Sequence, residues 1–143
     1  MFYADSSFLA SLYLQDAKTD VANAFLQRVQ TPLVLTPFNR VELRNALRNM
    51  VTRGEAKSGE VARAFALLEQ DVNEGLLIEK ALDQAKLFKL AERLSAQYAE
   101  KYAIRCVDLL HVSSAHVLGL KVFLTFDRQQ GAFAEASGLK IQP

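Results

Sequence analysis

Four acidic residues lie where expected strands end or helices begin, and their types suggest one metal site. Asp5 directly follows the apolar run "FYA", and Asp127 lies shortly after the run "VFLT". Asp108 is near the start of the helical stretch "CVDLLHVSSAHVLG", and Glu42 is in the helix that follows "LVLTP". Clustered carboxylates repel one another and raise one another's pKa values, and a divalent cation relieves that conflict. Oxygen ligands suit Mg²⁺ or Mn²⁺, which can activate a water molecule against a phosphodiester.

Each acid also has a simpler structural interpretation when it is taken alone. Asp5 can cap the helix that begins at Ser6, and Asp108 can interact with the dipole of its helix from the first turn. Asp127 can hydrogen-bond its own backbone in a turn, and Glu42 can be a solvated helix residue. The metal site is the preferred interpretation because the four acids occur together.

Short apolar strands alternate along the chain with longer helices, and these elements must position the acids. The expected strands are 2–4, 33–35, 76–78, 122–124 and 140–142, and the expected helices are 6–15, 18–30, 38–53, 58–74, 82–100, 105–119 and 128–137. This alternation predicts βαβ units and a mainly parallel sheet with helices on both faces. The ligand crevice of such a sheet lies beyond the carboxyl ends of its strands, where Asp5 and Asp127 are expected.

The helix expected over 38–53 has an unusual distribution of charge. Glu42 shares a face with the amide residue Asn45, and no basic residue lies three or four positions from it, which favours a polar pocket over a solvated surface. A second face has an arginine at every fourth position: Arg40, Arg44 and Arg48. That stripe is either a solvated helix face or a contact surface for RNA phosphates or an acidic partner.

The composition limits the remaining possibilities. The 143 residues are expected to form a single domain (1–143), and 17 basic against 16 acidic residues give a net charge of +1, so no overall basic field indicates nucleic acid. The single cysteine, Cys106, excludes an internal disulfide and is expected to be a buried thiol in a cytoplasmic protein. Neither a signal peptide nor a membrane-spanning apolar run is recognisable.

The two histidines do not suggest zinc. His111 and His116 are five positions apart, so they do not stack on one helix face, and no zinc-type pattern accompanies them. His116 is expected to be a packing or surface residue. His111, three residues after Asp108, is close enough to the expected pocket to contact a substrate.

Four segments together resemble the PIN-domain ribonucleases, and in particular the VapC-type toxins of prokaryotic toxin–antitoxin pairs. They are "YADSSFLASLYLQD", "VELRNAL", "RCVDLLHVSSA" and "LTFDRQQGAFAEASGLK", and the resemblance covers residues 2–142. It implies a three-layer α/β/α sandwich with a short, mainly parallel central sheet. It also implies an acidic pocket that binds Mg²⁺ or Mn²⁺ and cleaves RNA.

The resemblance further implies roles for individual residues and partners. Asp5 and Asp108 would be the principal metal ligands, Asp127 would bind the metal directly or through water, and Glu42 would bind the metal or orient the attacking water. Hydrogen bonds within the pocket would come from Ser6 or Ser7 and from Thr125, and Asn45 would support Glu42. Family members are commonly homodimers, inhibited by a cognate antitoxin that inserts a segment into a groove near the acids.

Two other functions are consistent with parts of this pattern. A non-catalytic PIN-like module that binds RNA or protein would share the fold, although clustered repulsive acids have no purpose there. An aspartyl-phosphate protein is disfavoured because position 7 is serine where a second acid is needed, and because "TFDR" offers no lysine after the late strand.

Overall fold

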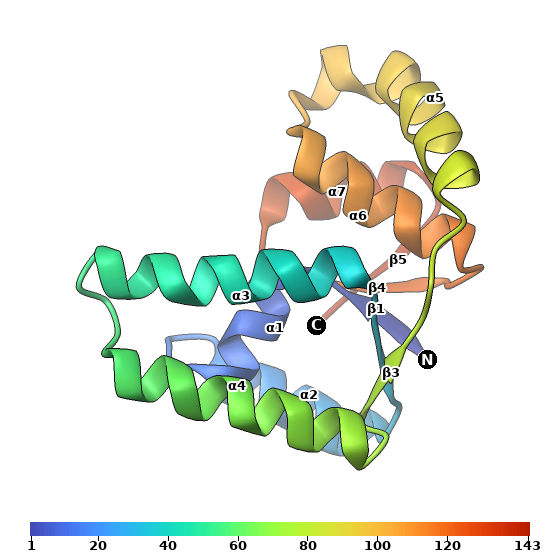
Figure 1. The fold of residues 1–143 in the computed structure, drawn as a ribbon. Helices are drawn as coiled ribbons and strands as arrows, with labels where there is room; N and C mark the ends of the chain where they lie inside the picture. Colours follow the sequence, from blue (N-terminus) through green and yellow to red (C-terminus); the bar gives the residue numbers. More distant parts are fainter.

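Five strands of three residues each form one parallel sheet in the order β3-β2-β1-β4-β5 (Figure 1). The coordinates are a computed structural model that describes residues 1–143. The strands are β1 (Phe2–Ala4), β2 (Leu33–Leu35), β3 (Leu77–Glu79), β4 (Val122–Leu124) and β5 (Lys140–Gln142). The helices are α1 (Ser6–Tyr13), α2 (Thr19–Val29), α3 (Pro37–Thr52), α4 (Ser58–Asn73), α5 (Gln84–Tyr102), α6 (Cys106–Val117) and α7 (Arg128–Ala136).

The first strand of the chain lies at the centre of the sheet. Tyr3 of β1 is in register with Val34 of β2 on one side and with Phe123 of β4 on the other. Because all the strands are parallel, their carboxyl ends meet at one edge of the sheet. The residues that follow β1, β2 and β4 therefore emerge close together, which is where the sequence places Asp5.

Helices cover both faces of the sheet, and the alternation of side chains along the strands separates two cores. Figure 1 shows α5, α6 and α7 together on one side, with α1 to α4 on the other. Ala4 and Leu124 pack into the core with α1 to α4, whereas Tyr3 and Phe123 pack into the core with α5, α6 and α7. The result is the predicted α/β/α sandwich.

Most element boundaries agree with the sequence prediction to within two residues. Helices α4, α6 and α7 end before Gly75, Gly119 and Gly138, whose φ angles of 76°, 69° and 98° lie in the left-handed region that glycine tolerates best. The third strand begins one residue later than expected, because Leu77–Glu79 is the stretch in register with Leu33–Leu35.

The expectation for Cys106 was wrong. Cys106 is the first residue of α6 and is exposed, because the first turn of this helix directs Asp108 inward and leaves Cys106 and Val107 facing solvent. None of the helices combines the length and apolar character that a membrane crossing requires.

Candidate active site

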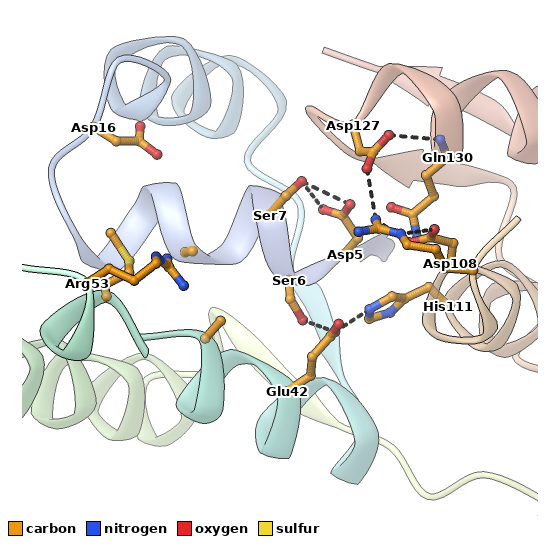
Figure 2. Close-up of a pocket in the computed structure, with 14 residues that line it drawn as sticks. Asp5, Ser6, Ser7, Asp16, Glu42, Arg53, Asp108, His111, Asp127 and Gln130 are labelled. Atoms are coloured by element: carbon orange, nitrogen blue, oxygen red, sulfur yellow. Dashed lines mark hydrogen bonds and ion pairs between the residues drawn. The ribbon is translucent and has the colours of Figure 1, made fainter. Parts of the chain in front are cut away.

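The carboxyl ends of the central strands open into an acidic pocket of about 380 Å³ (Figure 2). Five carboxylates and only two guanidinium groups line it: Asp5, Asp16, Glu42, Asp108 and Asp127, with Arg53 and Arg105. The four acids singled out in the sequence thus lie in one pocket, although they come from four separate places in the chain. Ser6, Ser7 and His111 line the same pocket.

Asp5 both caps a helix and faces the pocket. It directly follows β1 and caps α1, and its Oδ1 accepts a hydrogen bond of 2.8 Å from the backbone N–H of Phe8. The hydroxyl of Thr125 donates to Oδ2 at 2.6 Å, and that of Ser7 lies 2.8 and 2.9 Å from the two oxygens. Only 3% of Asp5 is exposed, and burial raises the pKa of its carboxyl although these donors oppose the shift.

Arg105 joins two of the other acids. It immediately precedes α6, and it donates to Asp108 from Nε at 2.7 Å and from Nη2 at 2.9 Å. Nη2 also donates to Asp127 at 3.0 Å. Hydrogen bonding to Asp108 raises the pKa of the Arg105 guanidinium, so a permanent positive charge lies between these two carboxylates. Asp127 also caps α7, accepting from the backbone N–H groups of Gln129 and Gln130 at 2.8 and 3.0 Å.

Glu42 is held from two other elements of the fold. Its Oε2 accepts hydrogen bonds from the Ser6 hydroxyl of α1 and is bonded to Nε2 of His111 on α6 (Figure 2). Partial burial acts to raise the pKa of Glu42, but the hydrogen bonds from His111 and Ser6 and the charge of Arg105 outweigh it, and the net pKa is lowered. Glu42 is therefore a carboxylate at neutral pH, facing the pocket from α3.

The donor chemistry of the pocket suits a hard divalent cation, but the side chains as they stand do not form a metal site. All four central acids offer carboxylate oxygens, and acids outnumber bases in the lining. No three His, Cys, Asp or Glu side chains are grouped so that they could hold an ion. The positive charge between Asp108 and Asp127 is supplied by Arg105, so a cation shared by these acids requires Arg105 to move aside.

The expected support of Glu42 by Asn45 was wrong. Asn45 is exposed and makes no hydrogen bond with Glu42, because the pocket-facing line of α3 continues through Ala46 and Met50. The expected partners from α1 and from the residue that follows β4 are present: Ser6 bonds Glu42, and Thr125 bonds Asp5.

The arginine stripe on α3, expected to be either a solvated helix face or a contact surface for RNA phosphates or an acidic partner, makes side-chain contacts within the protein. Arg40 pairs with Glu69 of α4 at 2.5 Å and with Glu79 of β3 at 2.9 Å, and Arg44 also pairs with Glu69. The guanidinium groups of Arg44 and Arg48 each lie 4.8 Å from the ring centre of Phe65. The stripe therefore stabilises the packing of α3 against α4. The arginines that line the pocket are Arg53 and Arg105.

Two features of the pocket were not found from the sequence. The ion pairs of Arg105 could have been suspected, since Arg105 and Asp108 are three positions apart across a helix start. The anchoring of Glu42 by His111 joins residues 69 positions apart, and no local pattern signals it. His116, which was expected to be a packing or surface residue, is partly buried, with Nε2 at 2.9 Å from the hydroxyl of Ser137.

Comparison with known proteins agrees with this architecture. The PIN domain family matches residues 2–137. Comparison with curated protein sequences gave no match. Among solved structures, the chain is similar to Mycobacterium tuberculosis VapC20, a sarcin–ricin loop cleaving toxin, with 19% identity, a TM-score of 0.72 and full coverage of both chains.

Two further solved structures share the fold. VapBC2 from Rickettsia felis, bound to a DNA fragment from their promoter, has 16% identity and a TM-score of 0.69, with 99% of this chain and 98% of that chain covered. FitAcB from Neisseria gonorrhoeae has 13% identity and a TM-score of 0.68, with 100% and 97% covered. At these identities the likeness concerns the fold.

Proposed function

The chain belongs to the PIN domain family, and on that premise we propose that it is a metal-dependent endoribonuclease and the toxin of a type II toxin–antitoxin pair. The main support is the meeting of Asp5, Glu42, Asp108 and Asp127 in one pocket. Four acids from separate elements are costly to bring together unless a cation neutralises them. RNA as the substrate class is supported by the likeness to VapC20, which cleaves the sarcin–ricin loop.

The proposed catalytic residues divide into metal ligands and a residue that handles water. Asp5 and Asp108 would hold Mg²⁺ or Mn²⁺, and Asp127 would bind it directly or through water. When bound, the cation would supply a water of lowered pKa and stabilise charge on the phosphodiester. Glu42, ionised and fixed by Ser6 and His111, would orient the attacking water. Thr125 and Ser7 would keep the carboxylate of Asp5 in place.

In the metal-free pocket, the guanidinium of Arg105 supplies the positive charge beside Asp108 and Asp127. Its side chain is 69% exposed, so it can leave Asp108 and Asp127 for solvent without the cost of uncovering a core. Once displaced, a guanidinium at the rim of the pocket would be available to an RNA phosphate.

The proposal includes partners. A cognate antitoxin is supported by the likeness to VapBC2. A homodimer is supported by an apolar groove between α3, α5 and α6, where Phe88 is 55% exposed. We also propose that residues 1–143 act as one domain in the cytoplasm. Sedimentation of the purified protein would test the dimer, and co-expression with the product of an adjacent gene would test the antitoxin.

Cleavage of total cellular RNA by the purified protein tests the activity. The wild type and Asp5→Asn would each be incubated with Mg²⁺, with Mn²⁺ and with a chelator. Asp83→Asn is a matched control, because Asp83 also caps a helix through its side chain, at α5, but lies outside the pocket. We expect discrete fragments from the wild type and from Asp83→Asn with metal, and none from Asp5→Asn.

Each of the other outcomes would decide against part of the proposal. Binding of RNA without cleavage under any metal would favour the alternative, a non-catalytic PIN-like RNA- or protein-binding module. Equal cleavage by Asp5→Asn would place the activity outside this pocket or in a contaminant. Cleavage that survives the chelator would remove the metal from the proposed mechanism.

A further inference from the structure

A buried chain of side chains leads from the sheet to Glu42. The hydroxyl of Tyr3 lies 2.9 Å from Nδ1 of His111, and Nε2 of His111 is bonded to Oε2 of Glu42. Tyr3 is fully buried, and His111 is 2% exposed. The rings are fixed as well, since Tyr3 stacks on Phe123 with centroids 5.5 Å apart and His111 lies 4.8 Å from the ring of Phe38.

The protonation of the His111 ring follows from the orientation of Asn39. The amide oxygen of Asn39 accepts from the backbone N–H of Thr36 at 3.2 Å, and its Nδ2 donates to the backbone carbonyl of Ala4 at 2.9 Å. These backbone partners admit only one orientation of the amide. The same Nδ2 lies 3.5 Å from Nδ1 of His111, so an N–H donor faces that ring nitrogen.

Nδ1 of His111 is therefore an acceptor, and the ring proton is on Nε2. An Nδ1–H group would point at the amide hydrogens of Asn39, whereas an unprotonated Nδ1 can accept from both Asn39 and Tyr3. The Nε2–H group then donates to Oε2 of Glu42. That oxygen also accepts from Ser6, so both donors use the same oxygen.

We propose that Tyr3 and Asn39 hold His111 as its Nε2–H tautomer, and that His111 is a positioning residue that presents Oε1 of Glu42 to the pocket. With Oε2 taken by two donors, Glu42 has one oxygen left, which suits accepting a proton from a water molecule better than chelating a cation with both oxygens. The catalytic part of this inference rests on the proposed function, but the tautomer does not.

The tautomer can be read directly from a long-range ¹H–¹⁵N correlation spectrum of metal-free ¹⁵N-labelled protein at neutral pH. The chain has two histidines, so the spectrum of His116→Gln identifies the signals of His111. We expect a protonated Nε2 and an unprotonated Nδ1. Asn39→Asp replaces the amide N–H group that faces Nδ1 with an acceptor oxygen, and we expect this variant to admit a proton on Nδ1. A ring protonated on Nδ1 in the wild type, or an unchanged ring in folded Asn39→Asp, would overturn the proposed tautomer.

Cleavage of a fluorescent RNA oligonucleotide, taken from a site cut in total RNA, tests the positioning role. We expect His111→Ala to lower kcat by about 10- to 100-fold with little change in KM, as for other residues that orient a catalytic ligand. His111→Gln should recover part of the rate because its amide N–H can replace Nε2–H, and His116→Gln should match the wild type. Thermal melting identifies any variant that fails to fold.

The failures of the two proposals are distinguishable. If folded His111→Ala cuts at the wild-type rate, or if folded His111→Gln is no faster than His111→Ala, the positioning role is wrong while the nuclease stands. If the wild type cuts no RNA with any metal, the proposed function is wrong, and the spectrum still decides whether Tyr3 and Asn39 fix the ring of His111.

Discussion

Replacing Arg105 by glutamine should increase the affinity of the pocket for a divalent cation. In the metal-free protein, Arg105 is bonded to Asp108 at 2.7 and 2.9 Å and to Asp127 at 3.0 Å. A metal ion shared by these carboxylates has to displace the guanidinium from them. Glutamine is of similar length and polar but carries no charge, so the variant removes this competition and keeps a side chain at the rim.

The size of the effect follows from the contacts. Two unit charges about 4 Å apart attract by about 1 kcal/mol in water and about 4 kcal/mol in surroundings with an effective dielectric constant of about 20. The Arg105 side chain is 69% exposed, so solvent screening favours the lower part of this range. We therefore expect a gain of about 1 to 2 kcal/mol in metal binding, which corresponds to an affinity about five- to thirtyfold higher.

Titration calorimetry with Mg²⁺, and the electron paramagnetic resonance signal of free Mn²⁺, would measure the affinity without any reference to cleavage. Arg53→Gln is the matched control, because Arg53 also lines the pocket but is bonded to Glu55 rather than to the central acids. It should change the affinity much less than Arg105→Gln. Equal effects of the two variants, or no gain in Arg105→Gln, would refute direct competition between Arg105 and the metal.

Three further variants test other parts of the structure. Burial raises the pKa of the Asp5 carboxyl above its ordinary value of 3.8, so folding favours the protonated carboxyl. The stability that this protonation contributes is fully present below pH 3.8 and is lost as the pH rises through the pKa of the folded state. In chelator, urea unfolding should therefore find Asp5→Asn more stable than the wild type at pH 7, by on the order of 1 kcal/mol, and the difference should shrink toward pH 4. Leu43→Ala, at a fully buried position of α3 in the core that α1 to α4 form with the sheet, should lower the free energy of unfolding by about 2 to 5 kcal/mol in the same assay. Arg44→Ala should lower the free energy of unfolding by about 1 kcal/mol, because the contacts of Arg44 with Glu69 and Phe65 are lost, while RNA cleavage stays at the wild-type rate. Slower cleavage would indicate a role for the stripe in RNA binding.

The parts of the site that sequence could predict are those that topology decides. In a parallel sheet, a residue directly after a buried strand lies at the carboxyl edge whatever its neighbours are, which placed Asp5 correctly. Asp5 both caps a helix, as its simpler interpretation predicted, and lines the pocket, because a helix that starts at the sheet edge holds its cap at that edge. Asp127, for which a turn was the simpler interpretation, is likewise a helix cap that lines the pocket.

The parts that sequence could not predict depend on which helices pack together. The acidic partner of Arg40 and Arg44 is Glu69 on α4, and only the packing of α3 against α4 reveals it. Asn45 and Ala46 are adjacent on α3, and the rotation of that helix about its own axis decides which of them faces the pocket. Cys106 illustrates the same limit, since apolar neighbours in sequence do not determine which side of a helix start is covered.

The central place of β1 also governs when the pocket can exist during synthesis. Asp5 is bonded to Thr125, 120 positions later in the chain, and the backbone N–H of Asp5 donates to the carbonyl of Leu124 at 3.0 Å. A ribosome-bound chain that has not yet released β4 has one edge of β1 unpaired and lacks Asp127 altogether. If the chain is the ribonuclease proposed above, the nascent protein is thus expected not to cleave the RNA of its own ribosome until almost the whole chain has been made.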